Sequence, residues 1–585
     1  MNVDATFDQL PAGPLQLHMS RSSPGRYAIH EFAKNVFDVR VTDDGGRALA
    51  LTHPNPQEWD VPNHSATVHV AYTVFGDRVD GTYLSVDSTH AHFNMPAVFM
   101  WAHGLELRPI TVQFERPPDT SWRVATQLLP GADPLTWTAP NLQYLMDSPT
   151  EFSDFTERTF TLNDNGRTRT YRFTVHHDGT DAELDAFITD VEKIVREERN
   201  VFGEYPDYEG GRYTFVADYL PWDHEDGMEH RNSTMMTSSA SIRTDRADLL
   251  DTVAHEFFHQ WNVERIRPKS LEPFNFDDAN MSGELWLAEG FTNYYGPLEE
   301  LRAGVTSLRE FVADMSQAVN AVINAPGRRI HTAVEMSEMA PFVDAATSID
   351  PTDFANTYIS YYTWGSAIAL GLDLSLRERT NGRVTLDDFM RAMWQKYGKP
   401  GGRLPGYVDR PYTMDDAKGV LAQVSGDAAF ANEFFTKNIQ GHDVVDYDRL
   451  LAAAGMRLRP IAPRAAYAGD LRLSDAAAGA RISGVVPAGS PAYDAGFERD
   501  DVIVAIGDMK IEAARDVARA LRSHEAGDTV SVAFERHGRR SSASMRLIED
   551  PRVRIVTGEE LGATLTDAQK RFRATWLSSA SRNAF

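Results

Sequence analysis

Two histidines at helical spacing are the residues of this chain best suited to chemistry. His255 and His259 lie four residues apart, with Glu256 between them, in an apolar stretch that predicts a helix. Side chains four residues apart lie one turn apart on the same helix face, so both imidazoles can reach one ion. Glu256 leans toward the same point, where it can take a proton from water. The spacing therefore predicts a zinc site with a base beside it, against the alternative of two ordinary helix histidines.

A third metal ligand must be found further along the chain, because catalytic zinc takes three protein ligands. The sequence has no cysteine, so the ligand must come from His, Asp or Glu. Glu289 lies in the apolar, aromatic run Leu285–Tyr295, where an unpaired carboxylate would be costly to bury. The alternative is an exposed carboxylate on an amphipathic helix. We predict that Glu289 completes the site and that one zinc ion binds per chain.

These motifs together resemble the gluzincin metallopeptidases, whose zinc is held by His, His and Glu. Twenty-nine residues separate His259 from Glu289, more than in the large membrane alanyl aminopeptidases. The string HEFFHQWNVERIRPKSLEPF at residues 255–274 is instead similar to the glycyl aminopeptidase family, gluzincins that carry a C-terminal PDZ domain. Ser23–Tyr27 also fits that family, and the resemblance covers essentially the whole chain.

The resemblance assigns substrate contacts to a string ahead of the zinc helix. Gly227, Met228, Glu229 and His230 match the segment whose Glu binds the free α-amino group of the substrate in related aminopeptidases. A carboxylate fixed near zinc would pair with an ammonium group, which favours cleavage next to the amino terminus. The alternative for Glu229 is a solvated loop carboxylate. His230 replaces an Asn of related enzymes, so it contacts substrate or orients Glu229.

A hydrogen-bond donor to the transition-state oxyanion is also expected. The segment Ser360–Gly365 opens a predicted helix and resembles the Y-x-x-G string whose Tyr serves this purpose in gluzincin aminopeptidases. The matching residue is Tyr362, and Tyr361 takes the position if the alignment shifts by one. The alternative is that the tyrosine at this position is an aromatic residue of the hydrophobic core with no part in the reaction.

The resemblance implies a zinc aminopeptidase that removes N-terminal residues, small ones of the Gly or Ala type, with Glu256 as general base. Its partners would be peptides with a free N-terminus. Two other functions stay open. One is a zinc endopeptidase with the same site, in which Glu229 is idle. The other is a non-catalytic, PDZ-containing scaffold that binds peptides.

The elements that must position these residues fall into four regions. Residues 1–178 show short alternating runs and predict an N-terminal antiparallel β domain. Residues 179–460 read as a helix, a strand and then many helices, and predict an α+β, thermolysin-like, mostly helical catalytic domain. Residues 465–552 resemble a PDZ domain, and residues 553–585 predict a C-terminal helical tail.

The PDZ prediction rests on the string Val486–Ala492 and the following Asp500–Ile503, which resemble bacterial protease-type PDZ domains. Such domains bind a peptide C-terminus by strand addition. The segment Tyr467–Leu471, which should hold the carboxylate, lacks the usual glycines. An intramolecular contact is therefore an equal expectation for this domain.

Composition excludes several classes of function. With 58 Lys and Arg against 84 Asp and Glu, the net charge of −26 argues against nucleic acid and anionic membranes as partners. The absence of cysteine excludes disulfides, thiolate metal sites and cysteine nucleophiles. The start of the chain has no signal-peptide pattern, and no apolar run approaches the ~18–20 residues of a membrane helix. We expect a soluble, cytoplasmic protein, or a periplasmic or secreted one if the chain is a processed form.

Overall fold

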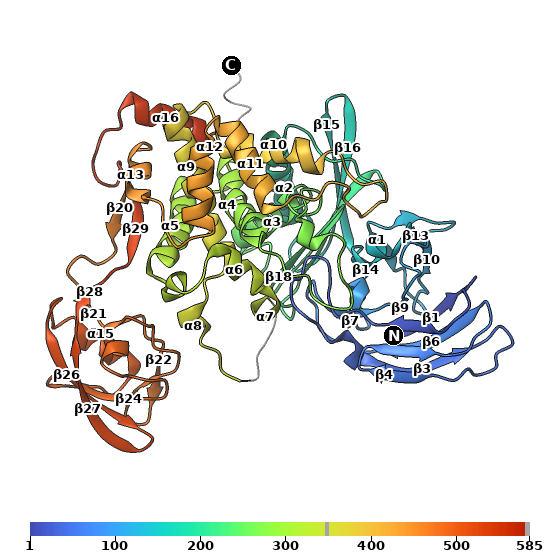
Figure 1. Cartoon of the computed structure of the whole chain (residues 1–585), viewed down its shortest axis with the longest axis horizontal. Helices are drawn as coiled ribbons and strands as arrows, with labels where there is room; N and C mark the ends of the chain where they lie inside the picture. The colour runs from blue at the N-terminus through green and yellow to red at the C-terminus, as the bar shows by residue number, and fades with distance from the viewer. Residues whose placement is uncertain (345–349, 580–585) are drawn as a thin grey trace.

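The computed structural model describes residues 1–344 and 350–579, which form a β-rich N-terminal domain, a central helical domain and a C-terminal β module (Figure 1). The two β-rich parts lie on opposite sides of the helical domain (Figure 1). This arrangement confirms the predicted fold class.

The N-terminal domain consists of short antiparallel sheets. Their strand orders are β1-β6-β3, β10-β13-β12, β11-β14-β8-β7 and β4-β5-β2-β9. Strand β6 shows why the segment folds this way, since Val68, Val70, Tyr72 and Val74 alternate toward the core and are buried. The elements are β1 (Asn2–Phe7), β2 (Leu15–His18), β3 (Val36–Thr42), β4 (Thr52–Asn55), β5 (Glu58–Val61), β6 (Val68–Val74), β7 (Leu84–Val86), β8 (His90–Phe93), β9 (Trp101–Ala102), β10 (Ile110–Gln113), β11 (Arg123–Thr126), β12 (Leu129–Pro130), β13 (Thr136–Ala139), α1 (Leu142–Met146) and β14 (Thr150–Ser153).

The central domain begins with a five-stranded sheet of order β15-β16-β17-β19-β18. Strands β16, β17 and β19 are parallel, whereas β15 and the edge strand β18 are antiparallel to their neighbours. The strands of residues 156–177, which the sequence pattern grouped with the N-terminal domain, thus pair into this sheet. Local alternation predicts a strand but not the sheet that it joins. The strands are β15 (Thr156–Asp164), β16 (Arg167–His177), β17 (Arg212–Tyr219), β18 (Asp226–His230) and β19 (Ser233–Ser238).

Helix α2 (Asp181–Phe202) connects β16 to β17 and is defined at both ends by the sequence. Thr180 and Glu183 form a capping box at its start, and Gly203 ends it with a φ of 87°. Its apolar face, including Leu184, Val191 and Val195, is buried in the main core. The helix predicted at the start of residues 179–460 is therefore present.

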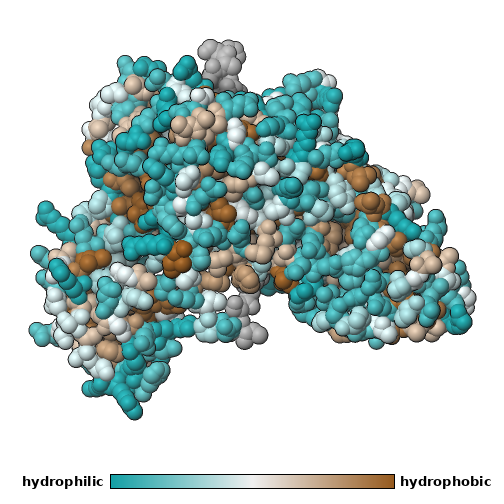
Figure 2. Space-filling model, viewed as in Figure 1, coloured by the Kyte–Doolittle hydropathy of each residue, from teal (hydrophilic) through white to brown (hydrophobic). Residues whose placement is uncertain are grey.

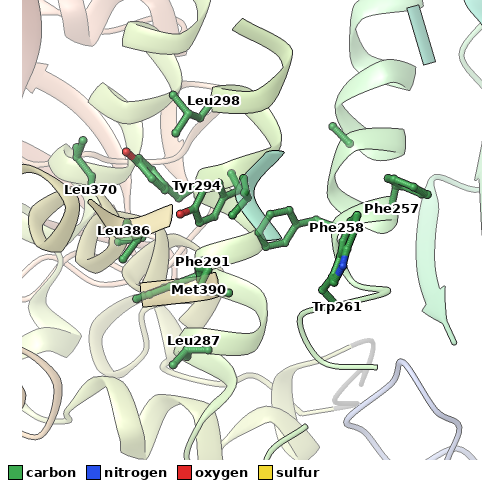
Figure 3. Packing of buried hydrophobic residues seen from close by; sticks show 14 of the residues in the cluster. Phe257, Phe258, Trp261, Leu287, Phe291, Tyr294, Leu298, Leu370, Leu386 and Met390 are labelled. Atoms are coloured by element: carbon green, nitrogen blue, oxygen red, sulfur yellow. The ribbon is translucent and has the colours of Figure 1, made fainter. Parts of the chain in front are cut away.

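Helices form the rest of the central domain. They are α3 (Arg246–Phe258), α4 (Leu285–Ala303), α5 (Leu308–Asn324), α6 (Ala333–Glu338), α7 (Ala340–Val343), α8 (Phe354–Thr357), α9 (Tyr361–Thr380), α10 (Leu386–Met393), α11 (Met414–Ser425), α12 (Ala428–Phe434) and α13 (Tyr447–Ala452). Figure 3 shows Phe257, Phe258 and Trp261 of the α3 segment in the same core as Phe291 and Tyr294 of α4. The helix that carries the two histidines is thus anchored by aromatic side chains on its other faces.

Helices α4 and α9 approach each other unusually closely, and two glycines permit it. A methyl group added at Gly290 would lie 2.2 Å from Cα of Gly365, and one added at Gly365 would lie 2.0 Å from the Trp286 carbonyl oxygen. Each glycine is therefore required for space and not for its backbone angles. This contact fixes Glu289 on α4 relative to the start of α9.

The C-terminal module has a sheet of order β22-β23-β24-β26-β27, with β25 paired to β24. The chain then returns to the central domain, where β29 pairs with β20 and α16 packs with Trp576 buried. The predicted tail over 553–585 therefore begins with a strand and not with a helix. The elements are β20 (Met456–Pro460), β21 (Ala466–Tyr467), β22 (Leu473–Ala476), β23 (Gly479–Ile482), α14 (Pro491–Asp494), β24 (Val502–Ile506), β25 (Met509–Lys510), α15 (Ala514–Leu521), β26 (Thr529–Arg536), β27 (Arg539–Arg546), β28 (Ile548–Glu549), β29 (Val553–Thr557) and α16 (Asp567–Leu577).

On the face shown in Figure 2, the surface is mostly hydrophilic with small, scattered apolar patches. Within the described residues, no helix is both long and apolar enough to cross a membrane.

Candidate metal centre and substrate site

His255 and His259 meet at the C-terminal end of α3, as the spacing predicts. Their Nε2 atoms are 3.0 Å apart and their rings are 4.7 Å apart, nearly perpendicular. The His259 side chain is 1% exposed and that of His255 is 17% exposed. An ion between the two rings would therefore be reached from the His255 side.

Glu289 completes a three-ligand cluster from α4. Its Oε2 lies 3.2 Å from Nε2 of His259 and 3.6 Å from Nε2 of His255. The three ligand atoms all lie within 4.8 Å of one another, and the carboxylate is buried. Two imidazoles and one carboxylate are a donor set that catalytic zinc sites use.

The electrostatics of the cluster favour a cation. Burial disfavours the charged form of His259, but the charges of Glu289 and Glu229 outweigh it and raise its pKa to about 10. Burial likewise disfavours charge on Glu289, but the nearby His259 and His255 hold its pKa well below the usual value. The surroundings thus stabilise positive charge where the three ligand atoms converge. The residues present fit a zinc ion.

Asn262 holds the ligands in place from the turn that follows α3. Its carbonyl oxygen lies 2.6 Å from Nδ1 of His259, which leaves Nε2 for the metal. Its Nδ2 donates to the carbonyl oxygens of Leu287 and Ala288 at 3.0 and 2.9 Å, next to Glu289 on α4. One side chain therefore joins the two helices that supply ligands.

Glu256 has the surroundings of a general base. It is 5% exposed, and among the described residues its Oε2 has no hydrogen-bond partner. Burial raises its pKa to about 8, opposed by the charge of His259 and assisted by those of Glu229 and Glu289. A carboxylate whose pKa lies near neutrality can both accept and return a proton.

The edge strand β18 presents alternate residues of the predicted substrate string to this cluster. A methyl group added at Gly227 would lie 2.2 Å from Oε1 of Glu256, so the glycine gives that side chain its room. Glu229 is 5% exposed, and its carboxylate lies within 4.8 Å of ligand atoms of Glu256 and His259. Burial raises the pKa of Glu229 to about 7.

Met228 and His230 lie on the other face of β18, because side chains alternate along a strand. Both are fully buried. The Met228 side chain lies against Gly25 and Gly81 of the N-terminal domain, and His230 Nδ1 lies 2.9 Å from Oδ1 of Asp147. The structure thus brings Gly227 and Glu229 to the cluster, and it places Met228 and His230 at the domain interface.

Both tyrosines at the start of α9 lie near the cluster, in different settings. The Tyr362 ring is 6.1 Å from the His255 ring and is partly exposed. The Tyr361 ring is 1% exposed and packs in a small core with Tyr27, Leu285 and Ala288. The hydroxyl group of Tyr361 is buried. Of the two tyrosines, Tyr362 therefore has the more accessible side chain, and its assignment as the donor stays a prediction.

Two residues of the N-terminal domain reach the site, and the sequence motifs gave neither of them a function. The Tyr27 hydroxyl donates to Oε1 of Glu289 and, at 3.3 Å, to Oε1 of Glu229. Arg26 forms an ion pair with Asp226 and donates to the Gly227 carbonyl oxygen at 3.3 Å, both on β18. The only sequence signal was that Ser23–Tyr27 fits the resembled family.

Comparisons with known families agree with this architecture. A model described as the Peptidase M61 N-terminal domain matches residues 1–154, and one described as M61 glycyl aminopeptidase matches residues 248–368. A PDZ model matches residues 466–547. The M61 peptidase match contains the three candidate ligands, Glu256 and Tyr362.

Comparisons with individual proteins add support for the fold. The crystal structure of an aminopeptidase N family protein from Idiomarina loihiensis has a TM-score of 0.82 and 21% identity, and covers 98% of this chain and 97% of that one. An M1 zinc metallopeptidase from Deinococcus radiodurans has a TM-score of 0.42 and 14% identity over 76% of this chain and 90% of that one.

The curated relatives cover only a short segment. A serine protease Do-like HtrA from Lactococcus lactis subsp. cremoris is 36% identical over 78 residues, which are 13% of this chain and 19% of that protein. The chain thus matches about a fifth of the length of the curated relatives. The family models confirm the resemblance seen in the sequence. Models of both M61 domains match in order along the chain, which thus carries the N-terminal and peptidase domains of the M61 glycyl aminopeptidase family.

Proposed function

We propose that this protein is a zinc aminopeptidase that removes single residues from the free N-terminus of peptides. The observation that carries the proposal is the position of Glu229 on the edge strand β18. Its buried carboxylate lies beside the side chains of Glu256 and His259. A carboxylate at this position can bind the substrate ammonium group by a charge-assisted hydrogen bond. The substrate then extends only one residue beyond the scissile bond on that side.

The ligands His255, His259 and Glu289 would hold zinc, which supplies Lewis-acid activation of water and of the scissile carbonyl when bound. Glu256 accepts the proton of the attacking water and returns it to the leaving amine. Tyr362 donates a hydrogen bond to the oxyanion. The edge strand β18 can pair with the substrate backbone, because one of its edges has no neighbouring strand among the described residues.

A small first residue such as Gly or Ala is the proposed preference. The description of the matching M61 model supports it. Tyr27 also supports it, since its hydroxyl contacts both Glu229 and Glu289 and so lies between the proposed amine anchor and the candidate ligand, where it limits the room beside the amine.

The test compares Glu229→Ala with wild type on an alanine p-nitroanilide and on an internally quenched, N-acetylated peptide. We expect kcat/KM on the free-amine substrate to fall on the order of 100-fold, because truncation removes one partner of a buried charge pair. Activity on the blocked peptide should be near background in both proteins. Glu225→Ala, which removes an exposed carboxylate four residues earlier, is the matched control.

Two further measurements separate the alternatives. Substantial wild-type cleavage of the blocked peptide, unchanged in Glu229→Ala, would identify an endopeptidase instead. Glu256→Gln should retain zinc and lose activity by about 10²- to 10⁴-fold. A wild-type protein with no zinc-dependent hydrolysis of either substrate would indicate a peptide-binding scaffold.

A further inference from the structure

A second group of ligand-type side chains lies where the N-terminal and central domains meet. His18 is the last residue of β2, His103 follows β9, and Asp277 belongs to the loop that leads to α4. One ligand atom from each lies within 4.8 Å of the other two. None of the three belongs to the cluster around Glu289.

The separations in this group suit a shared ion. His18 Nδ1 is 2.9 Å from Oδ1 of Asp277, and His103 Nε2 is 3.2 Å from Oδ2 of Asp277. The two imidazole rings are 4.2 Å apart and nearly perpendicular. Two ligands about 2.1 Å from one zinc ion at tetrahedral angles lie roughly 3.4 Å apart.

His18 lacks the hydrogen bonds that a buried imidazole needs. It is 5% exposed, and neither of its ring nitrogens has a hydrogen-bond partner among the described residues. Oδ1 of Asp277 is also buried without one, so the 2.9 Å approach is not aligned as a hydrogen bond. Buried polar atoms without an aligned hydrogen bond are costly even as a close ion pair, and a cation between the two would provide each with a direct bond.

The outer nitrogens of both histidines face carboxylates. His18 Nε2 lies 3.8 Å from Oε1 of Glu58, and His103 Nδ1 lies 3.5 Å from Oε1 of Glu106. Glu58 accepts a hydrogen bond from Gln16 Nε2 at 3.0 Å, and Glu106 accepts one from the Gly104 amide at 3.0 Å. Metal-binding histidines in proteins usually direct the other ring nitrogen to such an acceptor.

Another buried group shows what a purely structural histidine looks like. His92 lies close to Glu151 and Asp218, all buried. Its Nδ1 is 2.8 Å from Oδ2 of Asp218 and its Nε2 is 2.7 Å from the Asp80 carbonyl oxygen, both as hydrogen bonds. With both nitrogens occupied, His92 has no lone pair for an ion. His18 differs in this respect.

We propose that His18, His103 and Asp277 bind a second divalent cation of the zinc class, which joins the two domains. Two imidazoles and one carboxylate favour zinc over the all-oxygen sites of calcium or magnesium. The exposure of His103 gives the ion access from solvent.

The place of the site in the fold gives the ion a structural effect. The loop already docks on the N-terminal domain, where the Arg21 amide donates to the Phe276 carbonyl oxygen at 2.8 Å and the Phe276 ring enters the domain core. The ion would add a bond between the domains one residue further along. It would thereby stabilise the loop that precedes α4.

The experiment counts zinc in the full-length chain after loading with zinc chloride and exhaustive dialysis, by mass spectrometry of the metal. We expect two ions per chain in wild type, one in His103→Gln, one in Glu289→Gln and none in the double variant. His64→Gln, a partly exposed histidine of the same domain, should retain two. One ion in wild type, or equal content in wild type and His103→Gln, would overturn the proposal.

Thermal unfolding in the Glu289→Gln background isolates the second site from the catalytic one. Zinc should raise the Tm of that variant, because binding to the folded state alone stabilises it. The increase should disappear when His103→Gln or Asp277→Asn is added. A zinc-induced rise that persists in both would contradict the assignment. Failure of the catalytic proposal would instead appear as two ions retained in Glu289→Gln.

Discussion

The candidate centre depends on a side chain from outside the peptidase domain. Tyr27 lies 262 residues before Glu289, yet its hydroxyl donates to that carboxylate and also to Glu229. A hydrogen bond donated to a metal-binding carboxylate fixes the orientation of that carboxylate. Less conformational freedom is then lost when the metal binds. Tyr27 therefore connects the candidate metal ligand with the proposed amine anchor.

Tyr27→Phe should weaken zinc binding about 10- to 100-fold, because the change removes the hydroxyl donor and keeps the ring. Competition with a chromogenic chelator measures the zinc affinity, and kcat/KM at saturating zinc measures the activity that the variant retains. Tyr83→Phe, whose hydroxyl lies 3.1 Å from His30 Nδ1 in the same domain, is the control. Equal zinc affinity in Tyr27→Phe and wild type would reduce Tyr27 to a packing residue.

The ligand candidates and the base could be predicted from the sequence because they can be recognised from residue type and local spacing. His255, Glu256 and His259 occupy one helical turn, and Glu289 stands out in an apolar run. Tyr27 and Arg26 could not be assigned in this way. Their partners are more than 190 residues away, and only the folded chain brings them together.

At the scale of elements, the position of Glu289 depends on how closely α4 packs on α9. Gly290 and Gly365 face each other, and neither position has room for a methyl group. Packed interiors resist such added volume, so the helices would have to separate. Any separation also moves Tyr362 relative to the ligands, since that residue is in the first turn of α9.

Gly365→Ala should lower the free energy of unfolding by about 1–3 kcal/mol through overpacking. It should also reduce kcat while the protein stays folded. Urea denaturation followed by circular dichroism gives the stability. Gly419→Ala on α11 is the matched control, because its added methyl group meets no atom within 4 Å. That variant should gain about 0.5–1 kcal/mol. A neutral Gly365→Ala would show that the helices can separate freely.

Helices α2 and α4 also enclose carboxyl groups whose ionisation opposes folding. Both side-chain oxygens of Glu198 are buried without hydrogen-bond partners among the described residues. Burial, with the charges of Glu299 and Glu300 nearby, raises the pKa of Glu198 well above its usual value. The folded state therefore keeps a proton that the unfolded state releases near pH 4.5.

Stability should then fall as the pH rises above about 4.5, where the unfolded chain ionises and the folded one does not. Glu198→Gln has no proton to lose, so its unfolding free energy should decline less between pH 5 and pH 8. We expect the two declines to differ by about 1.4 kcal/mol for every pH unit over which only the unfolded chain carries the Glu198 charge. Denaturant unfolding of both proteins across this pH range measures the difference. Parallel decline in both proteins would mean that Glu198 ionises freely in the fold.

At the scale of the whole molecule, helix α16 packs on the peptidase domain although it follows the PDZ region in sequence. Trp576 on α16 is 1% exposed, and its Nε1 donates to the Tyr294 hydroxyl at 2.8 Å. Arg302 of α4 donates to the Trp576 carbonyl oxygen from two nitrogens, at 3.1 and 2.9 Å. The helix that carries Glu289 is therefore covered by a segment nearly 300 residues later.

Trp576→Ala should lower the free energy of unfolding by about 3–5 kcal/mol, because it empties a large core position. Denaturant unfolding monitored by far-ultraviolet circular dichroism measures the change. Trp222→Ala is the control, since that side chain is 64% exposed and should matter little. A change in unfolding free energy as small as that of Trp222→Ala would indicate that the core of the peptidase domain does not depend on α16.

The sequence predicted the order of the domains, because each has its own pattern of strands, helices and motifs. It could not show that residues 156–177 join the central sheet or that residues 553–557 form a strand. Both depend on pairing with partners distant in the chain, β17 for the first and β20 for the second. The net charge argued against nucleic acid and anionic membranes as partners, and it gave no information on which strands pair.

The pairing of β20 with β29 makes the whole PDZ region a loop of one antiparallel hairpin. Both of its connections leave the peptidase domain side by side, since Pro460 lies opposite Val553. A module attached in this way can be exchanged for a short turn without cutting the ladder beneath it. Asn356 of α8 adds a second attachment, because it donates to the Val486 carbonyl oxygen at 3.2 Å and accepts a hydrogen bond from the Ala488 amide at 2.6 Å. The ladder and this contact together hold the PDZ region against the peptidase domain, and neither involves a residue of the candidate site.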